Sequence, residues 1–411
     1  MIQNSFPKKK HFIMLAMLGG SLAGSASSYA GDLYFSGFMS IGGGFVTDSV
    51  EDGEGFEYNG FYEDDIQFNR NIFGLQLTGD ISDKLSATAQ LITRSEDDYE
   101  ITAEWAYMSW AVSDDSQIRF GRLRTPFYLY SDYLDVGYSY SWVRPPREVY
   151  YLPVNNIDGV DFYTTGTLGP LDTSLQAYFG GFDGTYDYVG STPETPTELN
   201  ASTRNQLGLA VTLGQTWWNF RLAYHQADFT LNTDPIPEFQ FALSSLEALG
   251  YGDLREDIAI EDDSTTFLQF GLTIDTDHFV AAAEHIEFET DDAFLPKAVR
   301  DYVMLGVRFN NVLIHGTYSM TEDERKELEN LVAPDPGNTA SLQARGILAA
   351  TSDTLWFNQD VVTIGVRWDV TTGAALKFQI DQIDRTDEDP VTMTSTDVDQ
   401  TVVTFAIQSV F

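Results

Sequence analysis

The chain has 411 residues and a formal net charge of −39, with 62 acidic against 23 basic residues, so it will not bind nucleic acid through bulk electrostatics. It contains no cysteine, which excludes disulfides and thiol chemistry. An aromatic content of 14% suits short amphipathic strands flanked by aromatic girdles.

The first thirty residues predict an export signal. Lysines at 8–10 precede an apolar run at 12–18, and small residues follow up to Ala30. The apolar run is far shorter than the ~20 residues that a membrane-spanning helix needs. We therefore expect a signal peptide at 1–30 rather than an anchor, and one mature domain at 31–411. No later segment reaches that length either, so a mature chain that crosses a membrane must do so as a closed barrel of strands.

Apolar residues recur with a period of two along most of the mature chain, which predicts about sixteen strands. Their lengths fit tilted transmembrane strands of ~9–11 residues plus rims. The predicted strands lie near 33–46, 65–81, 84–95, 100–113, 116–122, 156–166, 170–182, 203–214, 217–229, 265–275, 278–289, 299–310, 312–321, 358–370, 373–385 and 399–411.

The connections between these strands alternate in length. A barrel with short periplasmic turns and long external loops has this pattern, whereas a soluble sandwich or propeller has no reason to place every short turn at one edge. The tight turns are 82–84, 113–116, 168–170, 214–216, 276–277, 310–311 and 371–373. The other connections are 47–64, 96–99, 123–155, 183–202, 230–264, 290–298, 322–357 and 386–398.

Individual strands have one apolar and one polar face. Val362, Ile364 and Val366 share a face, while Thr363 lies on the other. Repeated around the predicted strands, this alternation favours lipid outside and water inside, and thus an all-β transmembrane antiparallel barrel. The segment 100–113 is apolar on both faces, which leaves open a subunit interface or a contact with an inward-folded loop.

The chain resembles the Gram-negative general porin family at four places. These are the cleavable signal, the opening strand at 33–38, the strand 118–122 that leads into the third long loop, and the terminal Phe411. Ser409 departs from the family, which usually has an aromatic residue there. The resemblance implies a homotrimeric, sixteen-stranded diffusion channel in the bacterial outer membrane, in contact with lipid and lipopolysaccharide. It also implies that the third loop folds into the lumen and that the assembly machinery reads Phe411.

The third long loop, about 123–155, is the best candidate for a pore constriction. Its many aromatic residues indicate that it is packed rather than exposed to water. Selectivity in a narrow pore is expected where basic wall residues face acidic loop residues. An alternative is that the arginines pair with loop carboxylates only to hold the loop in place. The candidate residues are Arg70, Arg94, Arg119, Arg122, Arg124, Asp132, Asp135, Arg144, Arg147 and Glu148.

The sequence carries no catalytic or metal-binding motif. The histidines come with no nucleophile elbow and no HExxH pattern, so we expect neither an enzyme nor a cofactor. Acidic runs in the predicted external loops have no calcium-loop spacing. They are interpreted as solvated surface, with divalent ions bridging to lipopolysaccharide or a neighbouring subunit as the alternative. The segments 239–249 and 324–331 have helical composition.

These features predict a porin that passes ions and small hydrophilic solutes by passive diffusion. The alternative is a substrate-selective channel, either for an anion such as phosphate or for an oligosaccharide. An anion channel needs a ladder of basic residues, to which Arg221, Arg308 and Arg367 are further candidates. A sugar channel needs an aromatic slide, and the third loop holds many aromatic residues. The sequence does not separate these alternatives from a general pore.

Overall fold

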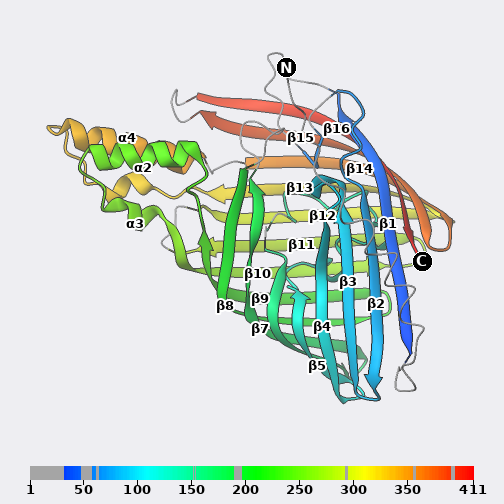
Figure 1. Cartoon of the computed structure of the whole chain (residues 1–411). Coiled ribbons are helices and arrows are strands. Elements are labelled where there is room, and N and C mark those ends of the chain that lie inside the picture. The colour runs from blue at the N-terminus through cyan, green and yellow to red at the C-terminus, as the bar shows by residue number, and fades with distance from the viewer. Residues whose placement is uncertain are drawn as a thin grey trace, which may run out of the picture.

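The computed structural model of the chain describes residues 32–47, 58–61, 64–150, 152, 154–188, 197–291, 295–354, 358–389 and 394–411. The predicted signal peptide lies outside them. Sixteen antiparallel strands form one closed barrel in which each strand pairs with its sequence neighbours and β1 pairs with β16 (Figure 1). The prediction of an all-β antiparallel barrel with sixteen strands is confirmed. No helix among the described residues is both long and apolar enough to cross a membrane.

The strands follow the predicted order with adjusted ends. β2 begins later than predicted because Asn71 diverts the backbone before it. The Asn71 side chain accepts a hydrogen bond from the Gly42 amide at 3.0 Å and donates one to the Phe68 carbonyl at 3.1 Å. The strands are β1 (Leu33–Val46), β2 (Ile72–Ser82), β3 (Leu85–Arg94), β4 (Ile101–Ser113), β5 (Ser116–Arg124), β6 (Asn156–Leu168), β7 (Leu171–Tyr188), β8 (Thr197–Gln215), β9 (Trp218–Leu231), β10 (Ile260–Asp275), β11 (Phe279–Thr290), β12 (Lys297–Phe309), β13 (Val312–Glu324), β14 (Asn358–Thr371), β15 (Ala374–Asp389) and β16 (Thr394–Val410).

Short turns gather at one end of the barrel, which we name the turn end, and long connections gather at the other, the loop end. The turn between β12 and β13 consists of Asn310 and Asn311, and Asn310 has the positive φ of 53° that such a tight turn requires. Gly169 and Gly373 meet the same requirement in two other turns, with φ of 62° and 83°. The predicted alternation of turns and loops is confirmed.

The two faces of the strands differ in exposure as predicted. On β14, the side chains of Val362 and Ile364 are 51% and 60% exposed, whereas Thr363 between them is 3% exposed. β4, which is apolar on both faces, follows the same rule: Met108 and Trp110 are exposed outside. The outer surface of the barrel is therefore apolar, and most polar side chains of the strands lie on its inner surface.

A small helical cap lies at the loop end, on the left of Figure 1. It consists of α2 (Pro237–Ala248), α3 (Leu254–Ile258), α4 (Thr339–Thr354) and the 3-10 turn η4 (Leu328–Leu331). Of the two segments with helical composition, 239–249 lies largely within α2, whereas 324–331 contains only the turn η4. The longer α4 was not predicted, although Asn338 caps it by accepting a hydrogen bond from the Ala340 amide at 3.0 Å.

The helices share an apolar core with the ends of neighbouring strands. We name this core the cap cluster. Its burial fixes the helices to the barrel, since short helices are marginal on their own in water. Its buried members are Val154, Ala201, Phe229, Phe239, Leu243, Leu246, Ile258, Ile260, Leu328, Val332, Ala344 and Leu348.

Candidate functional site between the β5–β6 loop and the barrel wall

The segment between β5 and β6 binds to the inward-facing side chains of distant strands. Its firmest anchor is Lys377 on β15, which is 4% exposed. The Lys377 ammonium donates hydrogen bonds to the carbonyls of Gly137 at 2.6 Å, Tyr140 at 2.6 Å and Trp142 at 2.7 Å. Because an ammonium has three donors, this arrangement satisfies the buried charge in full.

Two further strands hold the same part of the loop. Arg367 on β14 donates to the carbonyls of Tyr138 at 2.8 Å and Tyr140 at 2.9 Å. The Val143 amide donates to the Gln379 side chain of β15 at 2.9 Å, and the Val143 carbonyl accepts from Gln408 of β16 at 2.9 Å. Side chains from β14, β15 and β16 thus supply the hydrogen-bond partners that a buried loop backbone needs.

A carboxylate on β11 binds both ends of the loop. Glu284, which is 3% exposed, accepts hydrogen bonds from the Leu129 amide at 2.9 Å and the Tyr150 hydroxyl at 2.5 Å. It also accepts one from Gln269 on β10 at 3.0 Å. Glu284 does not stand out in the sequence, because nothing local distinguishes it from other inward-facing acids.

The loop aromatics form an apolar cluster with the inner wall, which we name the loop cluster. The Trp142 side chain is 1% exposed and donates to the Thr317 hydroxyl at 2.8 Å. Its ring meets Tyr302 edge to face, with centroids 5.6 Å apart. The aromatics are therefore packed rather than solvated. The buried members are Phe127, Tyr128, Tyr130, Tyr140, Trp142, Val149, Phe267, Ala282, Ile286, Tyr302 and Met304.

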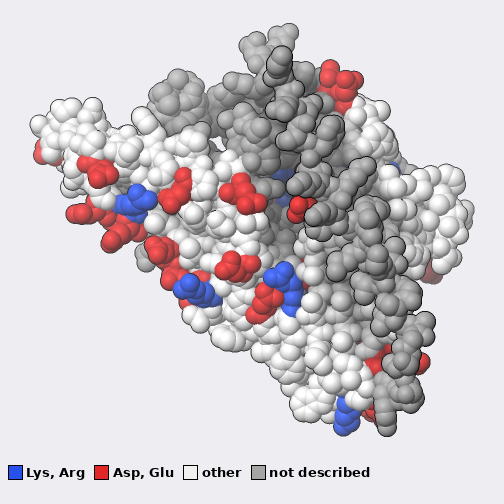
Figure 2. Space-filling model, viewed as in Figure 1, with Lys and Arg blue, Asp and Glu red and all other residues white. Residues whose placement is uncertain are grey.

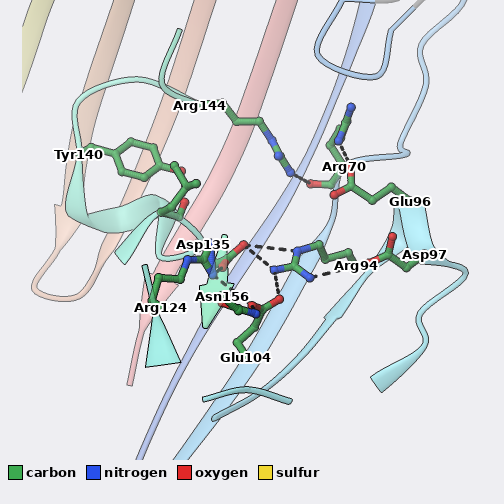
Figure 3. A network of polar contacts seen from close by, with 11 residues as sticks. Arg70, Arg94, Glu96, Asp97, Glu104, Arg124, Asp135, Tyr140, Arg144 and Asn156 are labelled. Atoms are coloured by element: carbon green, nitrogen blue, oxygen red, sulfur yellow. Dashed lines mark hydrogen bonds and ion pairs between the residues drawn. The ribbon is translucent and has the colours of Figure 1, made fainter. Parts of the chain in front are cut away.

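On the opposite wall, charged residues join the loop to β3, β4 and β5 (Figure 3). The Asp135 carboxylate lies 2.9 Å from the Arg94 guanidinium and 2.7 Å from that of Arg124. Glu104 on β4 pairs with the same two arginines, at 2.5 Å and 3.2 Å. Asn156, the first residue of β6, donates to Glu104 at 2.8 Å. Two arginines and two carboxylates therefore form one closed network.

The network changes the pKa of Asp135, its member from the β5–β6 loop. Burial by itself would raise the pKa of Asp135, but the guanidinium groups of Arg124 and Arg94 outweigh it and lower the pKa to about 2. Glu148 lies further along the same loop in a different environment. It accepts hydrogen bonds from Ser319 and from Tyr58, the latter at 2.9 Å, and burial raises its pKa despite these bonds.

Glu104 was not predicted, because its inward orientation depends on a β-bulge. The pairing of β3 with β4 passes from Gln90 and Trp105 to Leu91 and Ala103, which leaves Glu104 as an extra residue. A bulge directs two consecutive side chains to the same face. Both Glu104 and Trp105 therefore point inward, whereas alternation counted back from the exposed Met108 and Trp110 would have sent Glu104 outward.

Arg70 and Arg144 lie at the edge of the network (Figure 3). The Arg70 guanidinium donates to the Asn59 carbonyl at 2.9 Å and pairs with Glu96. Arg144 donates to the Arg70 carbonyl at 3.3 Å, and burial lowers the Arg144 pKa. Arg147 is half-buried in the same loop. Arg70 and Arg144 therefore hold backbone and loop segments together.

Arg119 and Asp132 form a second, more open group. Arg119 on β5 pairs with Asp161 on β6, where its Nε lies 2.7 Å from the carboxylate. Asp132 is exposed, in contrast to the buried Asp135 and Glu148. It lies close enough to Arg119 and to Arg221 of β9 to interact electrostatically with both.

Arg122 lies on the outer face of the barrel. It is two residues from Phe120, which is 48% exposed, and three from the inward Arg119. Its guanidinium pairs with Asp158 on β6, with the closest atoms 2.9 Å apart. The structure thus separates Arg122 from the other candidates, and the period of two alone was sufficient to place it on the opposite face from Arg119.

The assembled site is a set of satisfied ion pairs around a bound loop, with one exposed acid. No group of three or more His, Asp or Glu side chains in the described part of the chain is placed to hold a metal ion. Of the described histidines, His225 packs against Phe127 with ring centroids 4.7 Å apart, and His315 against Trp142 at 6.0 Å. They belong to the packing around the loop.

Comparison with solved structures places this geometry in a known fold. The outer-membrane channel DcaP of Acinetobacter baumannii aligns over 92% of this chain and 97% of its own, with a TM-score of 0.52 and 12% identity. An anion-selective porin from Comamonas acidovorans aligns over 92% and 99%, with a TM-score of 0.52 and 11% identity. OmpF of Salmonella typhi aligns over 92% and 97%, with a TM-score of 0.52 and 13% identity.

The chain has a porin-type barrel. No protein-family model matches it, and no curated protein is similar to it in sequence at a significant level. At these identities the likeness concerns the fold alone.

Proposed function

We propose that the chain is an outer-membrane porin whose water-filled channel passes ions and small hydrophilic solutes by passive diffusion. One observation carries the proposal. The β5–β6 loop is bound to two separate parts of the wall, through Asp135 to Arg94 on β3 and through its carbonyls to Lys377 on β15. A loop held in this way inside a barrel narrows the lumen without blocking it.

We place the selective part of the channel at the open group rather than at the buried network. Asp132 is exposed on the loop and lies within electrostatic range of two wall arginines. These are Arg119, which also pairs with Asp161, and Arg221, which also donates to the Pro126 carbonyl. Opposed charges across a narrow passage create a transverse field, which sorts solutes by charge and dipole. The buried network instead fixes the loop to the wall, through Arg94, Arg124, Asp135 and Arg144. Some arginines therefore have the structural role, and others the role in selectivity.

The substrate-selective alternatives have less support. An anion channel needs a continuous ladder of basic groups, but Arg308 pairs with Asp275 and Arg367 with Asp369, both at 2.8 Å. Arg221, the remaining candidate, donates to the Pro126 carbonyl and lies within electrostatic range of Asp132, so it does not extend into a ladder. A sugar channel needs exposed aromatic faces, but most loop aromatics are buried in the loop cluster. A general pore is therefore the simpler proposal.

The remaining parts of the proposal concern the surroundings of the barrel. We propose a homotrimer in contact with lipid and lipopolysaccharide, inserted by the outer-membrane assembly machinery after removal of residues 1–30. Acidic side chains spread over the helical cap and the adjoining strands, as Figure 2 shows. This surface enriches cations near the channel mouth at low salt. The enrichment weakens at physiological ionic strength, because charges are then screened beyond roughly 8 Å.

The test is the reversal potential across a KCl gradient, measured at two ionic strengths. We expect stronger cation preference at low salt. Arg119→Ser should shift the reversal potential further toward cations and Asp132→Asn toward anions, since each removes one side of the field. Arg122→Ser is the matched control, because it removes a positive charge from the outer face.

A reversal potential that responds neither to salt nor to Arg119→Ser would show that size alone sets selectivity. An equal response to Arg119→Ser and Arg122→Ser would contradict the proposed location of the field. Arg124→Ser tests the network instead. We expect it to change conductance, since it releases Asp135 and thereby loosens the loop.

A further inference from the structure

Arg119, the wall arginine of the open group, is bound by a buried carboxylate on the neighbouring strand. Asp161 lies directly opposite Arg119 in the register of β5 and β6, and it is 1% exposed. The Nε of Arg119 donates to one oxygen of Asp161 at 2.7 Å, and a second guanidinium nitrogen donates to the other oxygen. Gln176 on β7 donates to the same carboxylate at 2.6 Å. The guanidinium is therefore held on the wall by a two-point contact whose acceptor is itself fixed.

Asp132 competes with Asp161 for the same guanidinium. Its carboxylate lies within electrostatic range of Arg119, but it is exposed and forms no hydrogen bond or ion pair with the described residues. Two-point contacts between charged groups are among the strongest hydrogen bonds, and the buried Asp161 would be left with an uncompensated charge if Arg119 moved away. Asp132 remains hydrated, and an exposed ion pair gains little. Both effects favour the position of Arg119 on the wall.

Two aromatic rings stabilise the cation in this position. The ring centroids of Tyr107 on β4 and Tyr163 on β6 lie 5.6 Å and 6.0 Å from the guanidinium carbon of Arg119. A guanidinium at this distance from an aromatic ring is attracted by the negative face of the ring. The wall thus holds Arg119 through side chains from three strands besides its own, β4, β6 and β7.

We propose that Asp161 is a positioning residue for selectivity, which holds Arg119 on the wall and so prevents it from pairing with Asp132 across the passage. The inference rests on the proposed function, because it concerns the same open group. Opposed charges create a transverse field only while they stay apart. An arginine side chain is long and flexible, so a released guanidinium moves toward the exposed carboxylate. The resulting ion pair cancels the field and narrows the passage.

Asp161→Asn tests this role in single-channel recordings at low salt. The amide has the size of the carboxylate but lacks its charge, so we expect Arg119 to pair with Asp132 and the conductance to fall. Asp158→Asn is the matched control. It breaks the two-point contact of Asp158 with Arg122, which joins the same two strands on the outer face, and should leave the conductance as in the native channel.

The double variant Asp161→Asn with Asp132→Asn separates positioning from a simple loss of charge. Without Asp132 the released arginine has no partner across the passage, so the conductance should equal that of Asp132→Asn alone. A charge effect or a distorted wall would lower the conductance by the same factor in both backgrounds, which would overturn the inference.

Gln176→Leu covers the case in which Asp161→Asn does not fold. It keeps the carboxylate of Asp161 but removes the hydrogen bond that fixes it. We expect it to lower the conductance, by less than Asp161→Asn, and only in chains that retain Asp132. An unchanged conductance, or an equal fall with and without Asp132, would overturn the inference.

A crystal structure of the Asp161→Asn chain gives a readout that needs no conduction. We expect the Arg119 guanidinium within about 4 Å of the Asp132 carboxylate, the usual limit for an ion pair. A guanidinium that stays beside position 161 would overturn the inference. A native chain that conducts no ions would contradict the proposed function but not this structural result. A conducting native channel in which Asp161→Asn matches Asp158→Asn would overturn the inference alone.

Discussion

The guanidinium of Arg94 lies 2.9 Å from the carboxylate of Asp135, although 41 positions separate the two residues in the chain. Arg94 ends β3, and Asp135 lies in the middle of the β5–β6 loop. The contact therefore fixes the loop against a wall to which it is not directly connected. Because Arg124 and Glu104 share the same network, the loss of one member leaves the others with uncompensated charge.

Asp135→Asn should destabilise the barrel strongly. Removing one partner of a buried ion pair costs about 3–5 kcal/mol, since the opposite charges remain buried. The measurement is the free energy of unfolding in urea, in detergent micelles. Asp132→Asn is the control, because Asp132 is exposed on the same loop and its replacement should change stability by less than about 0.5 kcal/mol. Equal effects of the two substitutions would contradict a structural role for Asp135.

The same carboxylate predicts how stability depends on pH. The pKa of Asp135 is lowered to about 2 in the folded chain by Arg124 and Arg94, which outweigh the effect of burial, whereas an unfolded Asp has a pKa of about 3.9. A lowered folded-state pKa contributes stability that is present above pH ~4 and is lost as the pH falls toward ~2. The measurement is the free energy of unfolding of the native chain and of Asp135→Asn at several pH values between about 4 and 2. The native chain should lose more stability, and parallel curves would show that Asp135 is not coupled to the network.

Lys377→Met should loosen the loop. The ammonium of Lys377 binds the carbonyls of Gly137, Tyr140 and Trp142, and methionine fills a similar volume without a donor. Arg367 still donates to the Tyr140 carbonyl, but the carbonyls of Gly137 and Trp142 lose their donor. Each unpaired buried carbonyl costs about 1–3 kcal/mol, so this part of the loop should leave the wall. Single-channel recordings should show a changed mean conductance and more current noise. Lys84→Met, in an exposed turn, should leave both as in the native channel, and a quiet native-like Lys377→Met channel would refute the anchor.

Phe411→Ala should lower the yield of folded barrel rather than its conductance. Phe411 closes the pairing of the first and last strands through backbone hydrogen bonds with Gly37 at 2.8 and 2.9 Å. Its ring lies so close to Gly37 that a Cβ there would meet the ring at 2.5 Å. Gly37→Val should therefore lower the yield as well, by displacing the ring. Folded protein is measured by its heat-modifiable migration on gels. A normal yield with reduced conductance would mean that Phe411 belongs to the channel.

The sequence by itself determined the barrel, the number of strands and the end at which the loops lie. These features are local: the period of two sets each strand, and the turn residues between strands set their pairing. The dense aromatics of the 123–155 segment also predicted that this loop is packed. The period of two also places Arg119 and Arg122 on opposite faces of β5. The prediction that both belong to one site did not take this into account.

Only the tertiary structure decided which charges meet. Glu104 and Trp105 both point inward because of a bulge, and a bulge depends on the pairing of β3 with β4 rather than on either strand alone. Lys377 and Glu284 bind the loop from strands more than a hundred positions away in the chain. Contacts of this kind follow from the closure of the barrel, which brings together residues that no local pattern relates.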